Sequence, residues 1–200
     1  MAGSSQKFGV INDSTTSDFL KAYISQNTDE GSVLVIAYIA EGTTEQLQSQ
    51  WESPFEADSV GSVLEKAGGL LQAATGRTSK TKLNSQQVWQ GTLPVALSLT
   101  LQFRAYSDAL NEVDMAIAHL KAMASPEVNE ATPSGRIPQS VELSLGRRLI
   151  YSDMRIESVN VPWDGPKTSE GYLSSAEVTI EIQPLQMLNA SEILTTHRQG

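Results

Sequence analysis

The clearest structural signal in the chain is the stretch Val95-Ala96-Leu97-Ser98-Leu99-Thr100-Leu101-Gln102-Phe103-Arg104. Its large apolar side chains fall on alternate positions, and small or polar side chains fall between them. This period of two is typical of a β-strand with one face packed on a core and the other in water. Antiparallel sheets are the ones that leave a face solvated, so the stretch predicts a strand of an antiparallel sheet.

Further strands are predicted on both sides of this one. An apolar, β-branched run at 33–39 indicates a buried strand, and residues 43–54 indicate a strand or hairpin that ends at Pro54. In the C-terminal half, strands are predicted at 141–145, 149–161 and 172–182. A wide loop with Pro162, Gly165 and Pro166 separates the last two.

The faces of the last two strands follow from the same alternation. In the last strand, Ala176, Val178, Ile180 and Ile182 alternate with Glu177, Thr179 and Glu181. In the strand before it, Ile150, Ser152, Met154 and Ile156 are expected to oppose Tyr151, Asp153, Arg155 and Glu157.

Two helices are predicted from a change of period. Apolar residues from Val60 to Ala74 recur at helical spacing, with Ser59 as N-cap, and a second helix runs from Asp108 to Ala124 before Pro126. The fold class is therefore α+β, with mostly antiparallel β-sheets and two flanking helices. We expect a polar N-terminal arm over residues 1–30, with a short helix near 18–24, and one domain over 31–200.

Composition excludes several classes of protein. The 200 residues carry 14 Lys and Arg against 23 Asp and Glu, a net charge of −9, which argues against a basic nucleic-acid binder. The absence of cysteine excludes a disulfide scaffold and thiol catalysis. The longest apolar run, 33–40, is far short of the roughly 20 residues of a membrane helix. The first residues lack a secretory signal, so we expect a protein made in a reducing cytoplasm.

Catalytic, cofactor and metal sites are not predicted. The two histidines, His119 and His197, have no partners at ligand or triad spacing. Four carboxylates, Asp153, Glu157, Glu177 and Glu181, could act as acid and base only if they flank a pocket. On exposed strand faces they are more often the solvated side, with Arg155 as a cross-strand partner.

Two segments together resemble a known family of structural proteins. They are 91–120, with Leu101-Gln102-Phe103-Arg104-Ala105-Tyr106 before its helix, and 149–185, from Leu149-Ile150-Tyr151-Ser152-Asp153 to Gln183-Pro184-Leu185. Their order of strand, helix, long loop and paired strands resembles the tube-initiator proteins of contractile-tailed phage baseplates, and more loosely the tail tube family. The resemblance covers roughly the second half of the chain.

This resemblance implies a virion protein without an active site, with a tail-tube-like β-sandwich or barrel. Six copies would form a ring at the junction of baseplate and tube, assembled in the host cytoplasm. The ring would contact the baseplate hub and the tail tube protein, start tube assembly, and pass DNA through its lumen without a membrane or cofactor.

Two sets of residues are candidates for roles in such a ring. Glu177, Thr179 and Glu181 would line the lumen, where negative walls repel a passing polyanion. The loop 43–55 with Trp51, Pro54 and Phe55 is a candidate for contacts between rings or with the hub, as is the N-terminal arm. Both segments could equally be plain solvent-exposed loops.

Two alternatives stay open. The chain could be a tail tube subunit or a related tube protein of a contractile injection system. It could instead be a monomeric ligand-binding module, or an unrecognised hydrolase, that uses a cleft between the sheet and the two helices.

Overall fold

The computed structural model describes residues 4–28, 31–52, 87–126 and 137–197. The chain forms two compact units, one of Met1–Gln46 with Pro94–Gly200 and one of Leu47–Leu93. Each unit is described by itself below. The predicted helix at 59–74, and the residues Pro54 and Phe55, lie outside the described residues.

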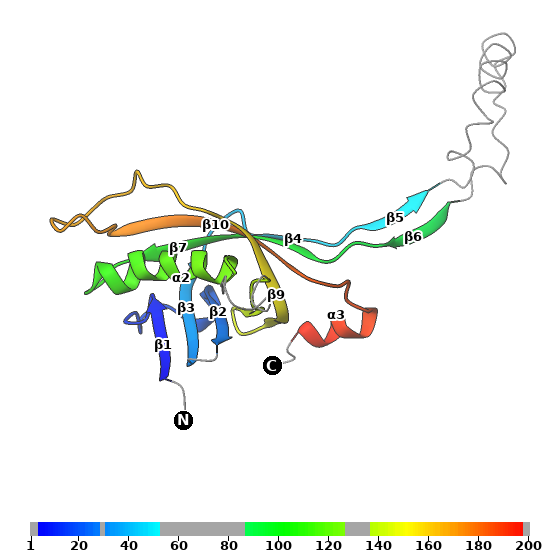
Figure 1. Ribbon diagram of the computed structural model, residues 1–200, viewed down its shortest axis with the longest axis horizontal. Coiled ribbons are helices and arrows are strands. Elements are labelled where there is room, and N and C mark those ends of the chain that lie inside the picture. The colour runs from blue at the N-terminus through cyan, green and yellow to red at the C-terminus, as the bar shows by residue number, and fades with distance from the viewer. Residues whose placement is uncertain (1–3, 29–30, 53–86, 127–136, 198–200) are drawn as a thin grey trace, which may run out of the picture. The chain divides into compact units, whose positions relative to one another are not determined.

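Six strands of the larger unit close into a barrel (Figure 1). Around the barrel they follow in the order β3 (Gly31–Ile39), β2 (Lys21–Thr28), β8 (Val141–Leu145), β9 (Leu149–Asn160), β10 (Ser175–Pro184) and β7 (Ala96–Arg104). The barrel closes where β7 returns to β3, through the pairs Tyr38–Gln102 and Ile39–Leu101. All six neighbouring pairs are antiparallel, so the predicted α+β class with a mostly antiparallel sheet is confirmed.

Two more strands extend the barrel wall. β1 (Ser4–Gly9) pairs in parallel with β3, and β4 (Thr44–Gln46) pairs antiparallel with β7. In the strand order β1 and β4 are the two terminal strands, each with one neighbour. Both are therefore edge strands of the described sheet.

The core is the inside of this barrel. Strand β7 contributes its alternate residues Leu97, Leu99, Leu101 and Phe103, and β10 contributes Ala176, Val178, Ile180 and Ile182, all buried. The predicted alternation of both strands is thus confirmed. Closure makes the pattern obligatory, because every second side chain of a barrel strand must point inward.

The second predicted helix is confirmed. It starts as a π-helical turn (η2, Leu110–Asp114), continues as α2 (Met115–Ala124), and ends before Pro126. Asp108 caps it, since its carboxylate accepts a hydrogen bond from the Asn111 N–H at 3.2 Å. Ile117 and Leu120 of α2 are buried against the core.

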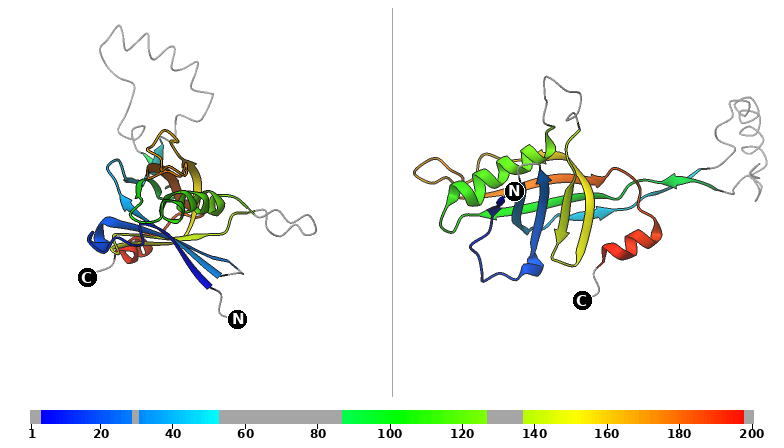
Figure 2. Two further views of the ribbon diagram at one scale, coloured as in Figure 1. Left: turned by 90° about the vertical axis from the view of Figure 1, so that its left-hand side faces the viewer. Right: turned by 60° about the horizontal axis from the view of Figure 1, so that its bottom comes forward.

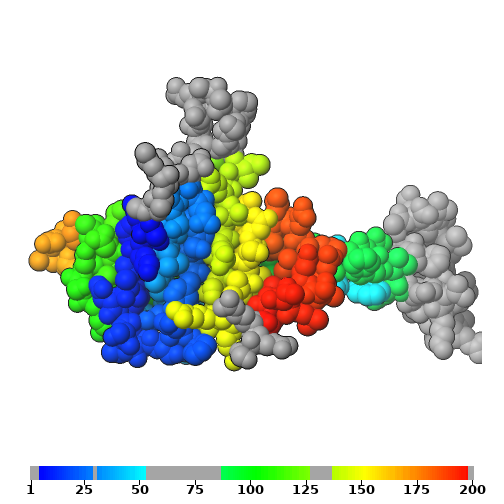
Figure 3. All heavy atoms as spheres, turned by 90° about the horizontal axis from the view of Figure 1, so that it is seen from below, coloured from blue at the N-terminus to red at the C-terminus, as the bar shows by residue number. Residues whose placement is uncertain are grey.

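A further short helix was not predicted. α3 (Ala190–Thr196) follows β10 and begins with a capping box, in which Asn189 and Glu192 satisfy each other's backbone N–H groups. It packs beside β9, as the lower face of the molecule shows (Figure 3). Its apolar positions are too few for a periodic signal.

The prediction of a polar arm is wrong for residues 4–28. They supply β1, a 3₁₀ turn (η1, Asp18–Leu20) and β2, and β2 lies inside the barrel order. The sequence of β2 gives little strand signal, because only Ala22 and Ile24 are apolar on its inner face. The views of Figure 2 show β2 and β3 running beside β8 and β9.

The predicted faces of β9 are also wrong in part. Tyr151, Met154 and Ile156 are buried together, although Tyr151 was assigned to the opposite face. A β-bulge causes the change, since the pairing with β8 shifts register between Val141 and Leu143, and Asp153 adopts a positive φ of 61°. A bulge adds one residue and so switches the alternation.

One buried carboxylate fixes the loop between β7 and the helix. Glu112 is 1% exposed and accepts hydrogen bonds from the N–H groups of Tyr106 (2.5 Å) and Ser107 (3.0 Å). Asn12 donates to its other oxygen at 2.6 Å. Burial alone raises the pKa of Glu112, but these donors lower it more, so the pKa lies below its ordinary value.

Glu112→Gln tests this network. The folded-state pKa lies below the usual 4.5, so the ionised carboxylate stabilises the fold above that pH, and its contribution is lost as the pH falls. We expect the variant to lose about 1–3 kcal/mol at pH 7 in urea unfolding. The difference from wild type should shrink below pH 4.5, and a pH-independent difference would contradict the assignment.

Gly9→Ala tests the contact of β1 with β3. Gly9 has a φ of +94°, and a Cβ there would lie 1.9 Å from the Ile36 carbonyl oxygen. Gly171→Ala is the matched control, because Gly171 has a φ of +92° with open space around it. The control should lose about 1–2 kcal/mol from backbone strain alone, and Gly9→Ala clearly more, as read from urea midpoints. Equal losses would contradict the tight β1–β3 contact.

Candidate functional site

The acidic row of β10 lies on the outer face of the barrel. Glu177 and Glu181 are exposed and Thr179 is half-buried, while their sequence neighbours point into the core. On β7 they face Gln102, Thr100 and Ser98, which are all uncharged. Thr179 and Glu181 also face Asn160 and Ser158 of β9. Beside the two glutamates the facing side chains of β7 are uncharged, whereas further along β10 the next outward residue, Gln183, pairs with Arg155 and donates a hydrogen bond to Glu157.

The four carboxylates do not gather around a cavity. Asp153 lines an open cavity near the start of β8, but Glu157, Glu177 and Glu181 line neither this cavity nor a second one on the outer face of the sheet. Arg155 was expected to pair across strands, and instead its guanidinium lies 3.2 Å from Asp153 on the same strand. Glu157 accepts a hydrogen bond from the Gln183 side chain. This arrangement does not bring an acid and a base together.

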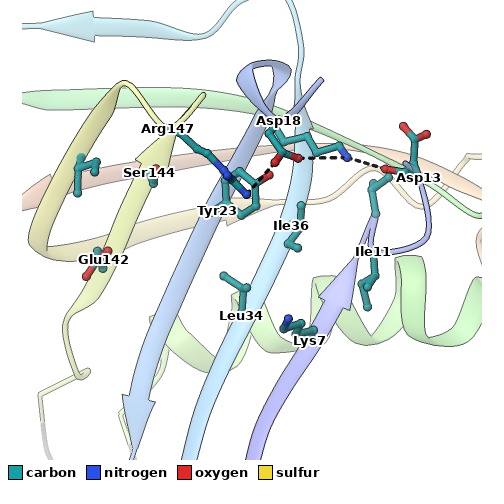
Figure 4. A pocket seen from close by; sticks show the side chains of 13 residues that line it. Lys7, Ile11, Asp13, Asp18, Tyr23, Leu34, Ile36, Glu142, Ser144 and Arg147 are labelled. Carbon is teal, nitrogen blue, oxygen red and sulfur yellow. Dashed lines mark hydrogen bonds and ion pairs between the residues drawn. The ribbon is translucent and has the colours of Figure 1, made fainter. Parts of the chain in front are cut away.

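This second cavity lies on the outer face of the sheet, over β1, β3, β2 and β8 (Figure 4). We call it the outer groove. Its volume is about 580 Å³, and its floor is made of the half-buried side chains of Leu34, Ile36 and Tyr23. Lys7 and Glu142 line it from β1 and β8. The outward residues of β3 are therefore apolar, although the sheet was predicted to have one polar face.

The charged groups at one end of the outer groove satisfy one another. The buried Lys21 ammonium donates to the Asp13 carbonyl oxygen at 2.7 Å and lies 3.8 Å from the Asp18 carboxylate. Asp18 also pairs with Arg147 at 2.7 Å, and Figure 4 shows this chain of contacts. Groups held in this way position the loop before β2 and are not free to bind an ion.

Asp13 is the anchor of that loop. Its carboxylate accepts hydrogen bonds from the Thr15 hydroxyl (2.5 Å) and from the Tyr38 hydroxyl (2.5 Å), and such donors hold its pKa well below the ordinary value. Burial, together with the bond to Asp13, raises the pKa of Tyr38. Tyr38 thus stays neutral and serves as a donor.

The histidines occupy unrelated positions. His119 of α2 stacks on Phe8 of β1 with ring centroids 4.1 Å apart, and burial lowers its pKa. His197 is exposed at the end of α3. Within the part of the chain that the structure covers, His, Asp and Glu side chains form no group of three that could hold a metal ion. No helix in that part is long and apolar enough to span a membrane.

The smaller unit is a two-stranded ribbon in its described portion. It consists of β5 (Ser49–Glu52) and β6 (Val88–Thr92), and its cross-strand pair Trp51–Trp89 is half-exposed, at 55% and 50%. Leu47, Val88 and Leu93 are exposed as well. A two-stranded ribbon is only marginally stable in water, and exposed apolar side chains of this kind are typical of interaction surfaces.

Trp51 and the acidic row of β10 were predicted as candidate surface residues from the sequence, whereas Trp89 and the outer groove were not. Trp89 becomes relevant only through its pairing with Trp51, which depends on strand register. The groove had a signal in the sequence, because 33–39 is apolar at every position, as in strands covered on both faces.

Comparisons with known proteins do not identify the chain. No protein-family model matches it, and a search of curated proteins gave no match.

Proposed function

We propose that this chain is a structural subunit of a contractile phage tail, and that it forms a ring at the junction of baseplate and tube that initiates tube assembly. The proposal rests on the resemblance of 91–120 and 149–185 to tube initiators. The feature of the fold that supports it best is the acidic row of β10, which lies outside the barrel and faces uncharged side chains of β7. The subunit would act in the virion tail and would have no catalytic role or cofactor.

The edge strands support a head-to-tail ring. β1 and β4 each have one neighbour in the described sheet, so a backbone edge of each remains for another chain. Contacts between two different surfaces of identical subunits generate closed rings when the rotation closes. In the proposed ring, the partners of each subunit are two further copies of itself.

The charge supports a lumen that passes DNA without holding it. Six copies carry 6 × −9 = −54 formal charges. With β10 turned to the axis, Glu177 and Glu181 repeat around the channel and Thr179 lies between them. A negative wall repels the phosphate backbone and prevents adsorption of DNA in transit.

The ribbon of β5 and β6 is suited to contact a protein outside the ring. Trp51 and Trp89 form an exposed aromatic pair, and such pairs are typical anchors of protein interfaces. We propose that this pair contacts the tail tube protein or the baseplate hub. Pro54 and Phe55 stay candidates for the same contact from the sequence alone.

Assembly is the first test. Purified protein mixed with its tube protein should give rings in negative-stain micrographs, and tubes that start on those rings. Tubes of this chain alone would instead identify a tail tube subunit. Particles that stay monomeric in the presence of tube and hub proteins would contradict both.

Charge reversal in the acidic row is the second test. Glu177→Lys with Glu181→Lys changes each chain from −9 to −9 + 4 = −5 and should leave assembly intact. Assembled rings of this variant should retain linear duplex DNA in a salt-sensitive way, because lysines in the lumen attract phosphate. The matched control is Asp164→Lys with Glu170→Lys in the exposed loop before β10, with the same net charge. Equal DNA retention by both variants would contradict a lumen-facing row.

A further inference from the structure

We propose that the outer groove is covered by the outer groove of a second copy of this chain, in a two-fold symmetric pair of the unassembled protein. The groove lies over β1, β3, β2 and β8. In the barrel order β2 is opposite β10, so this face is separate from the acidic row. The inference therefore does not depend on the proposed function.

The first observation is an apolar strand covered on one face only. Val35 and Ala37 of β3 are fully buried in the core, while Leu34 and Ile36 point outward and are half-buried. Strands that are apolar on both faces are characteristic of sheets covered on both sides. Ile11, which also lines the groove, is 39% exposed. An apolar floor open to solvent in this way is typical of an interaction site.

The second observation is a row of residues directly across the sheet. Lys7 pairs with Leu34, Leu34 with Ser25, and Ser25 with Glu142. The row therefore has a cation at the β1 end, an anion at the β8 end, and uncharged residues between, as Figure 4 shows for Lys7, Leu34 and Glu142. Three strand spacings separate the two charges by about 14 Å.

The two end charges are available for a partner. Both Lys7 and Glu142 are exposed, and neither makes an ion pair with any other residue in the described ranges. The remaining charges of the groove are already engaged: Lys21 and Arg147 pair with Asp18, and the Asp13 carboxylate accepts hydrogen bonds from the Thr15 and Tyr38 hydroxyls. The free charges thus form a dipole across the groove.

A dipolar row of this kind is complementary to itself. A two-fold axis parallel to the strands, between β3 and β2, reverses the row in the partner. Lys7 then faces the partner's Glu142, and Glu142 faces the partner's Lys7. The next row, Ile36 and Tyr23, brings Ile36 against the partner's Tyr23. Two sheets packed face to face lie about 10 Å apart, within reach of Lys and Glu side chains from both sides.

This charge complementarity selects a second copy over another partner. A partner of uniform charge would be attracted at one end of the row and repelled at the other. A second copy satisfies both ends at once through a single kind of contact, as two-fold interfaces do. Charged pairs at such a rim set register and specificity more than affinity.

Charge exchange tests the pairing. By sedimentation velocity over a range of concentrations, wild type should show a reversible dimer. Lys7→Glu alone and Glu142→Lys alone should each weaken the dimer at least tenfold, because each places like charges at both ends of the interface. The double variant with both substitutions should recover it. An equimolar mixture of the two single variants should give a heterodimer, because every contact in it joins opposite charges.

Control substitutions outside the groove, and one substitution in its apolar floor, complete the test of the dimer. Lys167→Glu and Glu170→Lys, in the exposed loop before β10, make the same charge changes elsewhere and should leave the dimer unchanged. Leu34→Ser should weaken it regardless of charge. The proposal is overturned by a monomer at all concentrations, by single variants that pair as wild type does, or by a mixture that fails to recover pairing. Dimers that respond equally to the control substitutions would also overturn it.

Discussion

The fold depends on a closed barrel that has to be filled by every second residue of its strands. The barrel closes through only two residue pairs between β3 and β7, so the backbone contact there is small. Its stability comes instead from the side chains inside, above all from β7 and β10, whose inward residues are almost fully buried. Because these two strands lie side by side over eight paired positions, their alternation fixes the register and hence the outer face as well.

This constraint explains which parts of the fold the sequence could predict. Where one face is apolar and the other polar, as in 95–104 and 176–182, the strand and both of its faces follow from the sequence. Strand β2 was not predicted because only two apolar side chains of this strand point into the core. The faces of β9 were misassigned because a β-bulge at Asp153 shifts the alternation. Glu112 carries no local signal at all, since its role depends on donors from Asn12 and from the chain at 106–108.

The residues of the candidate surfaces also differ in whether the sequence alone could predict them. Glu177, Thr179 and Glu181 were predicted on one exposed face, and the structure places them there. The pairing of Trp51 with Trp89 and the row from Lys7 to Glu142 depend on strands far apart in the chain. Only the apolar run at 33–39 hinted at the outer groove, because its composition exceeds what one packed face needs.

The proposed ring uses the acidic row of β10 and the edges of β1 and β4, whereas the outer groove belongs to the proposed pair of unassembled subunits. The barrel offers an acidic wall on β10, two backbone edges on β1 and β4, and an apolar groove opposite the acidic wall. The most direct test is a cryo-EM map of the assembled oligomer. We expect a closed ring with Glu177 and Glu181 of every copy directed to the axis. A ring in which these glutamates point outward, or lie buried between copies, would contradict this expectation.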